Sequence, residues 1–454
     1  MKKTFFISLF TAKFIKKFLD VTKLSGGTSI IGKIVLKLCP DFLSHTNKYI
    51  KTKINVTGTN GKTTTSGLIS HLIKESGHSV INNALGANMI QGVVNAIALE
   101  LNPFRKNPYD YSVIESDEAF LEVIYDKFEA DYLVVTNLFR DQLDRYGELA
   151  TTKKFIQNGI DKKPNLTLLL NSDDPLVSSF SGGKEHIFYG VNEVYYADEL
   201  KQTTSKTEEA FNCPNCGKPL IYDKKFYAQQ GHYYCECGYK RPEPKYKADV
   251  TLHKDHSVLN INGTDFEVPL VGLFNAYNAL GAIALCMEIG IGVNEIQDKI
   301  KTFKVAFGRS EIKYLNGKRT LIQLIKNPIG ANEVLKTIDL DSNLLIIIND
   351  NYADGRDVSW LWDAEFEVLS HSPSSHKEEG ANLQKEIVVS GTRANDMALR
   401  LKYAGVGVNN IKVIDNIEKA VDYVGEKADN NITILPTYTA LLKLNKIKKL
   451  KYRR

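Results

Sequence analysis

A glycine-rich segment, Ile54–Thr65, constrains the fold most strongly because it joins a strand pattern to a helix pattern through a tight turn. Polar and apolar residues alternate from Tyr49 to Val56, which is typical of a half-buried strand. After Thr63, apolar residues recur on one helical face until the pattern stops at Gly77. Backbone N–H groups and the dipole at such a helix start attract anions. The segment therefore predicts a phosphate-binding loop.

Side chains of this loop suit a nucleoside triphosphate with its magnesium ion. Lys62 offers a charge for the β- and γ-phosphates, and the Thr63 hydroxyl offers a ligand for Mg²⁺. Only two residues separate Gly58 from Gly61, whereas the standard phosphate loop has four, so a plain polar turn is the alternative. The predicted nucleotide-binding residues of the loop are Gly58, Thr59, Asn60, Gly61, Lys62, Thr63 and Thr64.

Short apolar strands separated by helical stretches predict a parallel sheet that helices cover on both faces. Ligands gather at the carboxyl ends of the strands in such sheets, which is where Thr57, Glu115, Asn137 and Asn171 fall. We expect Glu115 to hold Mg²⁺ opposite Thr63. Asp117 and Glu118 compete for this role, and a helix cap is the alternative for any of these acids.

Two amide side chains, Asn275 and Asn278, stand one turn apart in a helical stretch that begins near Leu273. Their amides suit a purine edge or a ribose, and a helix cap is the alternative reading. Both explanations stay open from the sequence alone.

Four of the six cysteines form two close pairs, each followed by glycine. Four thiolates can surround one ion tetrahedrally, so Cys213, Cys216, Cys235 and Cys237 predict a structural zinc site with no open position for catalysis. Two disulfides are the alternative, but nothing indicates export to an oxidising compartment. The stretch between the pairs has hairpin character.

The length of 454 residues predicts two or three domains. We expect a helical and loop-like segment at 1–48, broken at Gly26–Thr28 and at Gly32, and a central domain at 49–312 with the cysteine insert at about 208–245. A new series of strand and helix patterns begins at 313 and predicts a separate α/β domain at 313–454. This domain carries both tryptophans in the acidic stretch Asn349–Asp363. No apolar run is long enough to span a bilayer. We expect a cytoplasmic protein whose basic ends suit the inner face of an anionic membrane, with plain solubilising tails as the alternative.

Taken together, these motifs resemble the Mur ligases, the ATP-dependent amide-forming enzymes of peptidoglycan synthesis. Within them, the four-cysteine insert and the acidic Ala353–Asp363 stretch resemble the MurT family, the Mur-ligase-like subunits of lipid II isoglutaminyl synthases. The resemblance covers nearly all of residues 25–440. It rests on Gly58–Thr63, Gly86–Asn88, Glu115, Thr136–Asn137, Asp141–Gly147, Asn171–Asp174, Asn275, Asn278 and Phe307–Arg309.

The resemblance implies a central Mur-ligase-like ATPase domain with a parallel sheet and an inserted zinc ribbon, followed by a Rossmann-like α/β domain. It also implies a carbon–nitrogen ligase: ATP phosphorylates the α-carboxylate of D-glutamate in the lipid II stem peptide, and ammonia from a GatD-like glutaminase converts it to D-isoglutamine. Carried over, Lys62 and Thr63 hold phosphates and Mg²⁺, Glu115 holds Mg²⁺, and Asn275 and Arg309 lie near the nucleotide. Asp357 completes the partner's Cys–His pair, although Asp354 is close enough in sequence to exchange roles with it.

The residues fit a missing glutaminase independently, because hydrolysis of glutamine needs an activated cysteine beside a histidine. Cys39 and Cys286 are isolated, and neither has the context of a nucleophile. A second Mg²⁺ stays open: Gln142 stands where many Mur ligases have histidine, and Lys153 and Lys154 are both candidates for the modified lysine.

Two other functions compete with this one. An amino-acid-adding ligase of the Mur or folylpolyglutamate type shares the fold, but it would need neither the cysteine insert nor the acidic tryptophan stretch. A nucleic-acid-binding zinc ribbon is the other, and the acids among the lysines of the insert argue against it.

Overall fold

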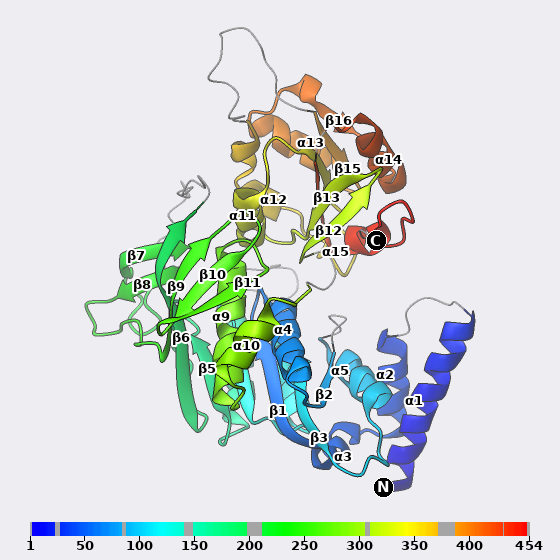
Figure 1. The fold of residues 1–454 in the computed structure, drawn as a ribbon, viewed down its shortest axis with the longest axis vertical. Coiled ribbons are helices and arrows are strands. Elements are labelled where there is room, and N and C mark those ends of the chain that lie inside the picture. Colours follow the sequence, from blue (N-terminus) through cyan, green and yellow to red (C-terminus); the bar gives the residue numbers. More distant parts are fainter. Residues whose placement is uncertain are drawn as a thin grey trace. The chain divides into compact units, whose positions relative to one another are not determined.

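A computed structural model describes residues 2–22, 28–83, 88–139, 149–197, 211–304, 309–370, 386–429 and 431–451 (Figure 1). Two compact units emerge from the contacts within it. The first comprises the described parts of 1–139, 148–269 and 273–304, and the second comprises 270–272 with the described residues beyond 304. The predicted domain boundaries at 48/49 and 312/313 remain predictions.

Helices form most of the N-terminal segment. They are α1 (Lys2–Thr22), α2 (Thr28–Leu38) and α3 (Phe42–Thr46), followed by the 3-10 turn η1 (Asn47–Tyr49). The expectation that Gly32 breaks this segment is wrong, because Gly32 lies inside α2. A Cβ atom there would come within 1.8 Å of the Gln91 carbonyl oxygen on α5 (Ile90–Glu100). The glycine therefore serves close packing of two helices and does not end one.

A nine-stranded sheet forms the centre of the first unit, in the order β11-β10-β9-β6-β5-β4-β1-β3-β2. In this order, every neighbouring pair between β9 and β2 is parallel. Strands β9, β10 and β11 pair antiparallel and form one edge of the sheet. The sequence analysis did not anticipate this antiparallel edge. The strands are β1 (Ile50–Thr57), β2 (Val80–Asn82), β3 (Tyr109–Glu115), β4 (Tyr132–Val135), β5 (Thr167–Asn171), β6 (Glu185–Tyr196), β9 (Tyr246–Leu252), β10 (Ser257–Ile261) and β11 (Thr264–Val268).

Helices cover both faces of this sheet, as the apolar strands predict. One face packs against α5, α6 (Leu121–Tyr125), α8 (Leu149–Asp161) and the N-terminal helices in one continuous apolar core. Contacts on the other face come from α4 (Lys62–Glu75), α9 (Leu273–Glu288) and α10 (Val293–Ile300) (Figure 1). Strand β1 has β3 on one side and β4 on the other. Strands β2 and β3 are thus added to the sheet on one side of β1, and β4 and β5 are added on the other side. The loop after β1 therefore lies at the topological switch point, where α/β sheets bind ligands.

The insert contains a hairpin of β7 (Ile221–Tyr227) and β8 (Gln230–Tyr234) between the two cysteine pairs. This confirms the hairpin expected there. Cys213, Leu220, Tyr233 and Cys235 form its small core.

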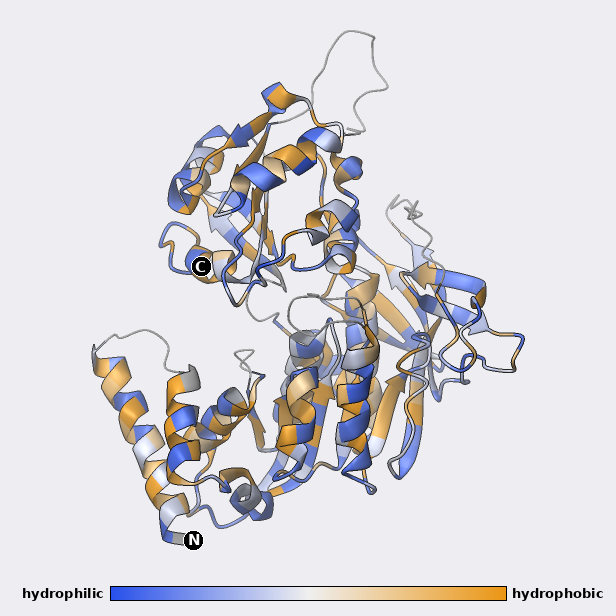
Figure 2. Cartoon of the chain, turned by 180° about the vertical axis from the view of Figure 1, so that it is seen from behind, coloured by the Kyte–Doolittle hydropathy of each residue, from blue (hydrophilic) through white to orange (hydrophobic). Residues whose placement is uncertain are grey.

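The second unit is an α/β domain with a six-stranded sheet in the order β12-β13-β17-β14-β15-β16. Only β12 and β13 pair antiparallel. Figure 2 shows hydrophobic residues along the strands of both sheets. The elements are β12 (Arg309–Leu315), β13 (Lys318–Gln323), α11 (Pro328–Thr337), β14 (Asn343–Ile347), α12 (Trp360–Asp363), η3 (Phe366–Ser370), β15 (Ile387–Ser390), α13 (Ala394–Tyr403), η5 (Val408–Asn410), β16 (Ile411–Val413), α14 (Ile417–Lys427), β17 (Ile432–Pro436) and α15 (Tyr438–Leu444).

Among the described helices, none has both the length and the apolar character needed to cross a bilayer.

Candidate nucleotide site and cysteine cluster

The loop between β1 and α4 has a backbone that only glycine fits at two positions. Gly58 has φ of 124° and Gly61 has φ of 86°. A Cβ on Gly58 would lie 2.4 Å from the Thr136 hydroxyl oxygen, and one on Gly61 would lie 1.9 Å from Oδ1 of Asn278. Positive φ and close neighbours both exclude side chains here. The loop is therefore pressed against β4 on one side and α9 on the other.

Thr136 and Asn137, which follow β4, hold the loop between β1 and α4 in place through hydrogen bonds to its backbone. Oδ1 of Asn137 accepts a hydrogen bond from the Asn60 backbone N–H at 2.8 Å, and Nδ2 of Asn137 donates to the Asn60 carbonyl at 3.0 Å. The Thr136 hydroxyl donates to the same carbonyl at 2.7 Å. Asn137, predicted as a nucleotide-binding residue, thus acts in this structure on the backbone of the loop.

Lys62 is the first residue of α4, and its side chain is nearly buried. Its Nζ donates to the Gly58 carbonyl and lies 3.1 Å from Oε1 of Glu118, which is also buried. The charge of the lysine is therefore held over the loop by a carboxylate from the segment after β3. Asp117 accepts from the Ala119 backbone N–H and caps the 3-10 turn η2 (Glu118–Phe120). The cap predicted as an alternative for these acids applies to Asp117.

Glu115 ends β3 and points at the start of α4. Its Oε2 accepts a hydrogen bond from the Thr63 hydroxyl at 2.6 Å, and its Oε1 accepts one from Nδ2 of Asn88 at 3.3 Å. Asn83 exchanges two hydrogen bonds of 2.8 Å with the Glu115 backbone and fixes the end of the strand. The structure thus brings together the two residues predicted as magnesium ligands. Sequence reasoning did not single out Asn83 or Asn88 individually.

The two asparagines of α9 are buried and face the same region. Oδ1 of Asn278 accepts from the Thr65 hydroxyl at 3.4 Å, and Nδ2 of Asn278 donates to Oδ1 of Asn275 at 3.4 Å. They therefore connect α9 to the phosphate-loop helix. Several motif residues lie outside the described part of the chain: Gly86, Asp141–Gly147 with Gln142, Phe307, Gly308 and the side chain of Arg309.

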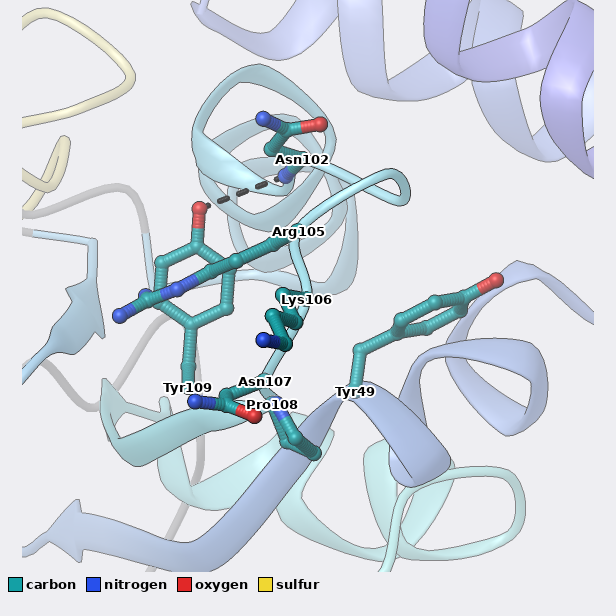
Figure 3. Close-up of a pocket in the computed structure, with 7 residues that line it drawn as sticks. All are labelled: Tyr49, Asn102, Arg105, Lys106, Asn107, Pro108 and Tyr109. Carbon is teal, nitrogen blue, oxygen red and sulfur yellow. Dashed lines mark hydrogen bonds between the residues drawn. The ribbon is translucent and has the colours of Figure 1, made fainter.

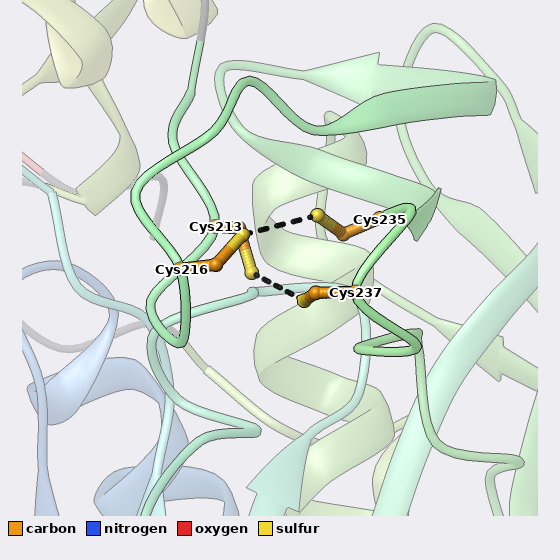
Figure 4. A group of neighbouring side chains, drawn as sticks. All are labelled: Cys213, Cys216, Cys235 and Cys237. Atoms are coloured by element: carbon orange, nitrogen blue, oxygen red, sulfur yellow. Dashed lines mark hydrogen bonds between the residues drawn. The ribbon is translucent and has the colours of Figure 1, made fainter.

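The four predicted cysteine ligands converge on one point (Figure 4). Their sulfur atoms all lie within 4.8 Å of one another, and the Cys213–Cys237 and Cys216–Cys235 sulfurs are 3.6 and 3.5 Å apart. A tetrahedral zinc with Zn–S bonds of about 2.3 Å separates its sulfurs by roughly 3.8 Å, whereas a disulfide needs about 2.05 Å. All four thiols are unpaired by disulfides. The cluster therefore fits a metal ion better than two disulfides.

A tight backbone turn closes each cysteine pair, and a backbone hydrogen bond favours the thiolate at Cys216. Gly217 and Gly238 have positive φ and donate their N–H groups to the carbonyls of Cys213 and Cys235, which closes a tight turn at each pair. A backbone hydrogen bond at Lys218 lowers the pKa of Cys216 to about 7. Thiolates are the form that binds metals.

A polar network that the sequence analysis missed anchors the insert to the end of β5. Nε of Arg241 lies 2.5 Å from Oδ1 of Asp173, a fully buried carboxylate that also accepts from Val191 N–H and the Tyr277 hydroxyl, both at 2.7 Å. Tyr233 and Tyr239 donate to the carbonyls of Ser172 and Pro175 at 3.1 and 2.6 Å. Arg241 follows a cysteine pair in sequence, but no local pattern indicates its distant partner.

Asp174, next to this anchor, is completely buried, and burial raises its pKa to about 6. It accepts hydrogen bonds from the backbone of Leu138 at 2.9 Å and from Nε2 of Gln229 at 3.2 Å. Gln229 belongs to the insert and also donates to the Leu138 carbonyl at 2.5 Å. The insert thereby contacts the segment that carries Asn137.

The isolated cysteines are both buried, and burial raises the pKa of each thiol. A neutral, enclosed thiol is a poor nucleophile, as the sequence analysis expected for Cys39 and Cys286. Lys153 is partly buried on α8, and burial lowers its pKa, whereas Lys154 is exposed.

In the second unit the two candidate acids have different surroundings. Asp354 is buried and accepts from the Thr439 N–H at 2.6 Å and from its hydroxyl at 2.5 Å, which ties the acidic stretch to α15. Asp357 is only partly buried, and both its carboxylate oxygens accept hydrogen bonds from Ser359. Asp354 therefore supports the loop, and Asp357 stays accessible on it.

Both tryptophans follow these acids in the chain and lie in α12. Trp360 packs partly buried against the core of the second unit, whereas Trp362 is half exposed with its ring 5.5 Å from that of Tyr403. Buried Arg400 lies behind Trp362 and donates to the Leu361 and Ala364 carbonyls at 2.8 and 2.7 Å. The exposed rings therefore sit on a rigid support.

Comparison with known families accounts for both units. The Mur ligase middle domain matches residues 56–221, and the MurT ligase C-terminal domain matches residues 324–441. Subunit MurT of the glutamine-hydrolysing lipid II isoglutaminyl synthase of Staphylococcus aureus (strain COL) is 37% identical over 423 residues, which cover 91% of each chain. The chain belongs to the MurT family.

Other relatives of this MurT-family chain agree with the assignment. The subunit of the same name from Streptococcus pneumoniae (strain ATCC BAA-255 / R6) is 33% identical over 94% of this chain and 93% of its own. Among solved structures, a pseudomurein peptide ligase type C from Methanothermus fervidus superposes with a TM-score of 0.65 at 24% identity, covering 88% of this chain and 79% of that one. That likeness shows the Mur ligase fold, and the family carries an ATPase domain.

Proposed function

We propose that this chain is the synthetase subunit of a lipid II isoglutaminyl synthase, a carbon–nitrogen ligase of peptidoglycan synthesis. The substrate carboxylate, the α-carboxylate of D-glutamate in the stem peptide, takes the γ-phosphoryl group of ATP, and ammonia then displaces phosphate to leave an amide. The observation that carries the proposal is the assembly of Lys62, Thr63 and Glu115 at one sheet edge in a chain of this family.

The loop side chains supply positioning and charge for this chemistry. Phosphoryl transfer depends mainly on alignment and on neutralising the charge of the phosphates. Lys62 is held over the loop by Glu118, and its ammonium is the group that we propose to contact the phosphates, together with the N–H groups of Gly61 and Lys62. Asn137 keeps the loop backbone in that shape through its contacts with Asn60. Asn275, Asn278 and Arg309 remain proposed contacts of the nucleotide.

The residues around the loop fit a magnesium ion. Thr63 and Glu115 offer two oxygens 2.6 Å apart, and oxygens are the ligands that Mg²⁺ prefers. Bound there, the ion would neutralise charge on the phosphates. The four cysteines fit a structural zinc ion, because all four positions of a tetrahedron are filled by protein sulfur.

Ammonia comes, in this proposal, from a separate glutaminase subunit of the GatD type. None of the six cysteines of the chain is a suitable nucleophile, because four converge as metal ligands and two are buried with raised pKa. Asp357 is the acid we propose to complete the partner's Cys–His pair, since it is accessible whereas Asp354 is committed to Thr439. Trp362 and Tyr403, which are exposed and contact each other in the same unit, suit the contact surface.

Reconstitution tests the proposal. The chain, with ATP, Mg²⁺ and lipid II, receives either ammonium chloride or glutamine plus a GatD-type glutaminase, and D-isoglutamine is followed by mass spectrometry. We expect product in both reactions and none with Lys62→Ala, while Lys74→Ala at the far end of α4 keeps activity. Incorporation of an amino acid in place of ammonia would assign the chain to the amino-acid-adding ligases instead.

A further inference from the structure

Helix α1 exposes a continuous apolar stripe on the face that it turns away from the core. Phe5, Leu9 and Ala12 are buried against the first unit. On another side of the helix, five large apolar residues recur at steps of three and four, which places them on one face. They are Ile7, Phe10, Phe14, Phe18 and Val21, and Phe14 is 73% exposed.

A turn after α5 extends this stripe. The Phe104 ring is 73% exposed and lies 6.3 Å from the Phe10 ring and 6.0 Å from the Phe6 ring. Single exposed apolar residues are ordinary, but a contiguous patch of aromatic rings marks an interaction surface. We call these five stripe residues and Phe104 the aromatic ridge.

The helix that carries the ridge and the helix packed against it are rich in lysine. Five lysines lie on α1, two more on α2, and Asp20 is the single acid across the two helices, where it pairs with Lys16. Lys13 reaches the Leu101 carbonyl at 2.8 Å and fixes α1 to the end of α5. Lys3, Lys17, Lys33 and Lys37 are exposed.

Two further cations adjoin Phe104 in a shallow cavity of about 130 Å³ (Figure 3). Arg105 and Lys106 line it together with Tyr49 and Tyr109, and the Arg105 guanidinium lies 4.5 Å from the centre of the Tyr109 ring. The tyrosine ring holds the guanidinium in place next to the ridge. The turn thus carries the exposed apolar side chain of Phe104 next to two cations, Arg105 and Lys106.

We propose that the aromatic ridge and its lysines dock this chain on an anionic lipid bilayer. Helices that lie in the membrane interface combine aromatic residues on one face with lysines beside them, so that the rings enter the acyl boundary while the cations meet lipid phosphates. The lysine-rich rim complements such a surface. The choice of a bilayer rather than a protein partner rests on the proposed function, whose substrate is a lipid. Docking by α1 holds the first unit, which also carries the nucleotide loop, at the surface where that substrate lies.

Vesicle co-sedimentation of the full chain tests this proposal without ATP or substrate. Vesicles are made of phosphatidylcholine alone or of an equal mixture with phosphatidylglycerol. We expect binding to the mixed vesicles that weakens in high salt, as electrostatic attraction is screened. Phe14→Ser should weaken binding about tenfold, because one well-exposed ring no longer enters the bilayer. The matched control is Val123→Ser, a half-exposed apolar position on α6 of the same unit, which should bind as wild type.

Equal binding by wild type and Phe14→Ser overturns the proposal, as does the absence of binding to mixed vesicles. A dimer in sedimentation velocity that Phe14→Ser dissociates would assign the ridge to a second copy of the chain. Phe14 belongs to the ridge and does not pack into the core, so the thermal stability of Phe14→Ser should match that of wild type. Amidation in detergent micelles is measured separately, so failure of docking and failure of the proposed function give different results.

Discussion

The buried ion pair between Arg241 and Asp173 allows a quantitative test of how the cysteine insert supports the first unit. The carboxylate of Asp173 is 0% exposed and the Arg241 side chain is 10% exposed. Arg241→Ala leaves Asp173 with hydrogen-bond donors but without the cation that contacts it. Breaking such a pair from one side destabilises by about 3–5 kcal/mol.

This loss is large against a domain stability of about 5–15 kcal/mol. For a unit of this size class it should lower the Tm by roughly 5–15 °C. The assay is thermal unfolding in zinc-containing buffer, with hydrogen exchange of peptides from β5, β6 and the insert to locate the change. The lost protection should centre on the segment around Asp173.

A double variant separates the charge from the packing. Asp173→Asn combined with Arg241→Met removes both charges, so it should lose less stability than the two single variants added together. The control is Lys218→Ala on the same insert, whose pair with Glu236 is exposed on both sides and should leave the Tm unchanged. A Tm for Arg241→Ala equal to that of the control, or full additivity in the double variant, would refute the reasoning.

Three other predictions follow from the site. Cys213→Ser should lower the zinc content measured by plasma emission spectroscopy and lower the Tm, because Cys213 is a buried member of the sulfur cluster; zinc retained at full stoichiometry would count against the site. Asp357→Asn should impair amidation driven by glutamine more than amidation driven by ammonium salts, whereas Asp354→Asn should mainly lower stability; equal losses with both nitrogen sources would place Asp357 at the nucleotide. Asp174 has a pKa raised to about 6, so its contribution to stability is present below pH about 4 and is lost as the pH rises through about 6. The stability difference between wild type and Asp174→Asn, followed by urea unfolding, should therefore change between pH 4 and 7; a constant difference would contradict the raised pKa.

Local chemistry made the nucleotide loop predictable. Its glycines, Lys62 and Thr63 occupy a single strand–turn–helix, and Glu115 follows from the rule that carboxyl ends of parallel strands meet at one edge. The structure places Thr63 and Glu115 in direct contact. The convergence of the four cysteines was equally predictable, because the members of each pair are close together in the sequence.

Long-range contacts are what the sequence could not provide. In the sequence, Gly32 suggests a helix break, and only its contact with Gln91 shows that it serves close packing. Arg241 likewise suggests a surface cation, and only the structure shows its ion pair with Asp173. Residues 68 positions apart make that ion pair, and no periodicity relates them. The antiparallel edge of β9, β10 and β11 was missed because the insert interrupts the chain just before it.

The insert contacts the first unit mainly through the residues between and beyond its cysteine pairs. Gln229, Tyr233, Tyr239 and Arg241 make these contacts, and Gln229 reaches Leu138, one residue from Asn137. The cysteine cluster and the attachment to the first unit thus use different side chains of one short segment. Excising the segment in a shortened chain would therefore remove hydrogen bonds to Leu138, Ser172, Asp173 and Pro175 together with the four cysteines. Gln229 is the attachment residue that reaches the segment of Asn137, whereas Tyr233 also packs beside Cys213 and Cys235 in the core of the insert.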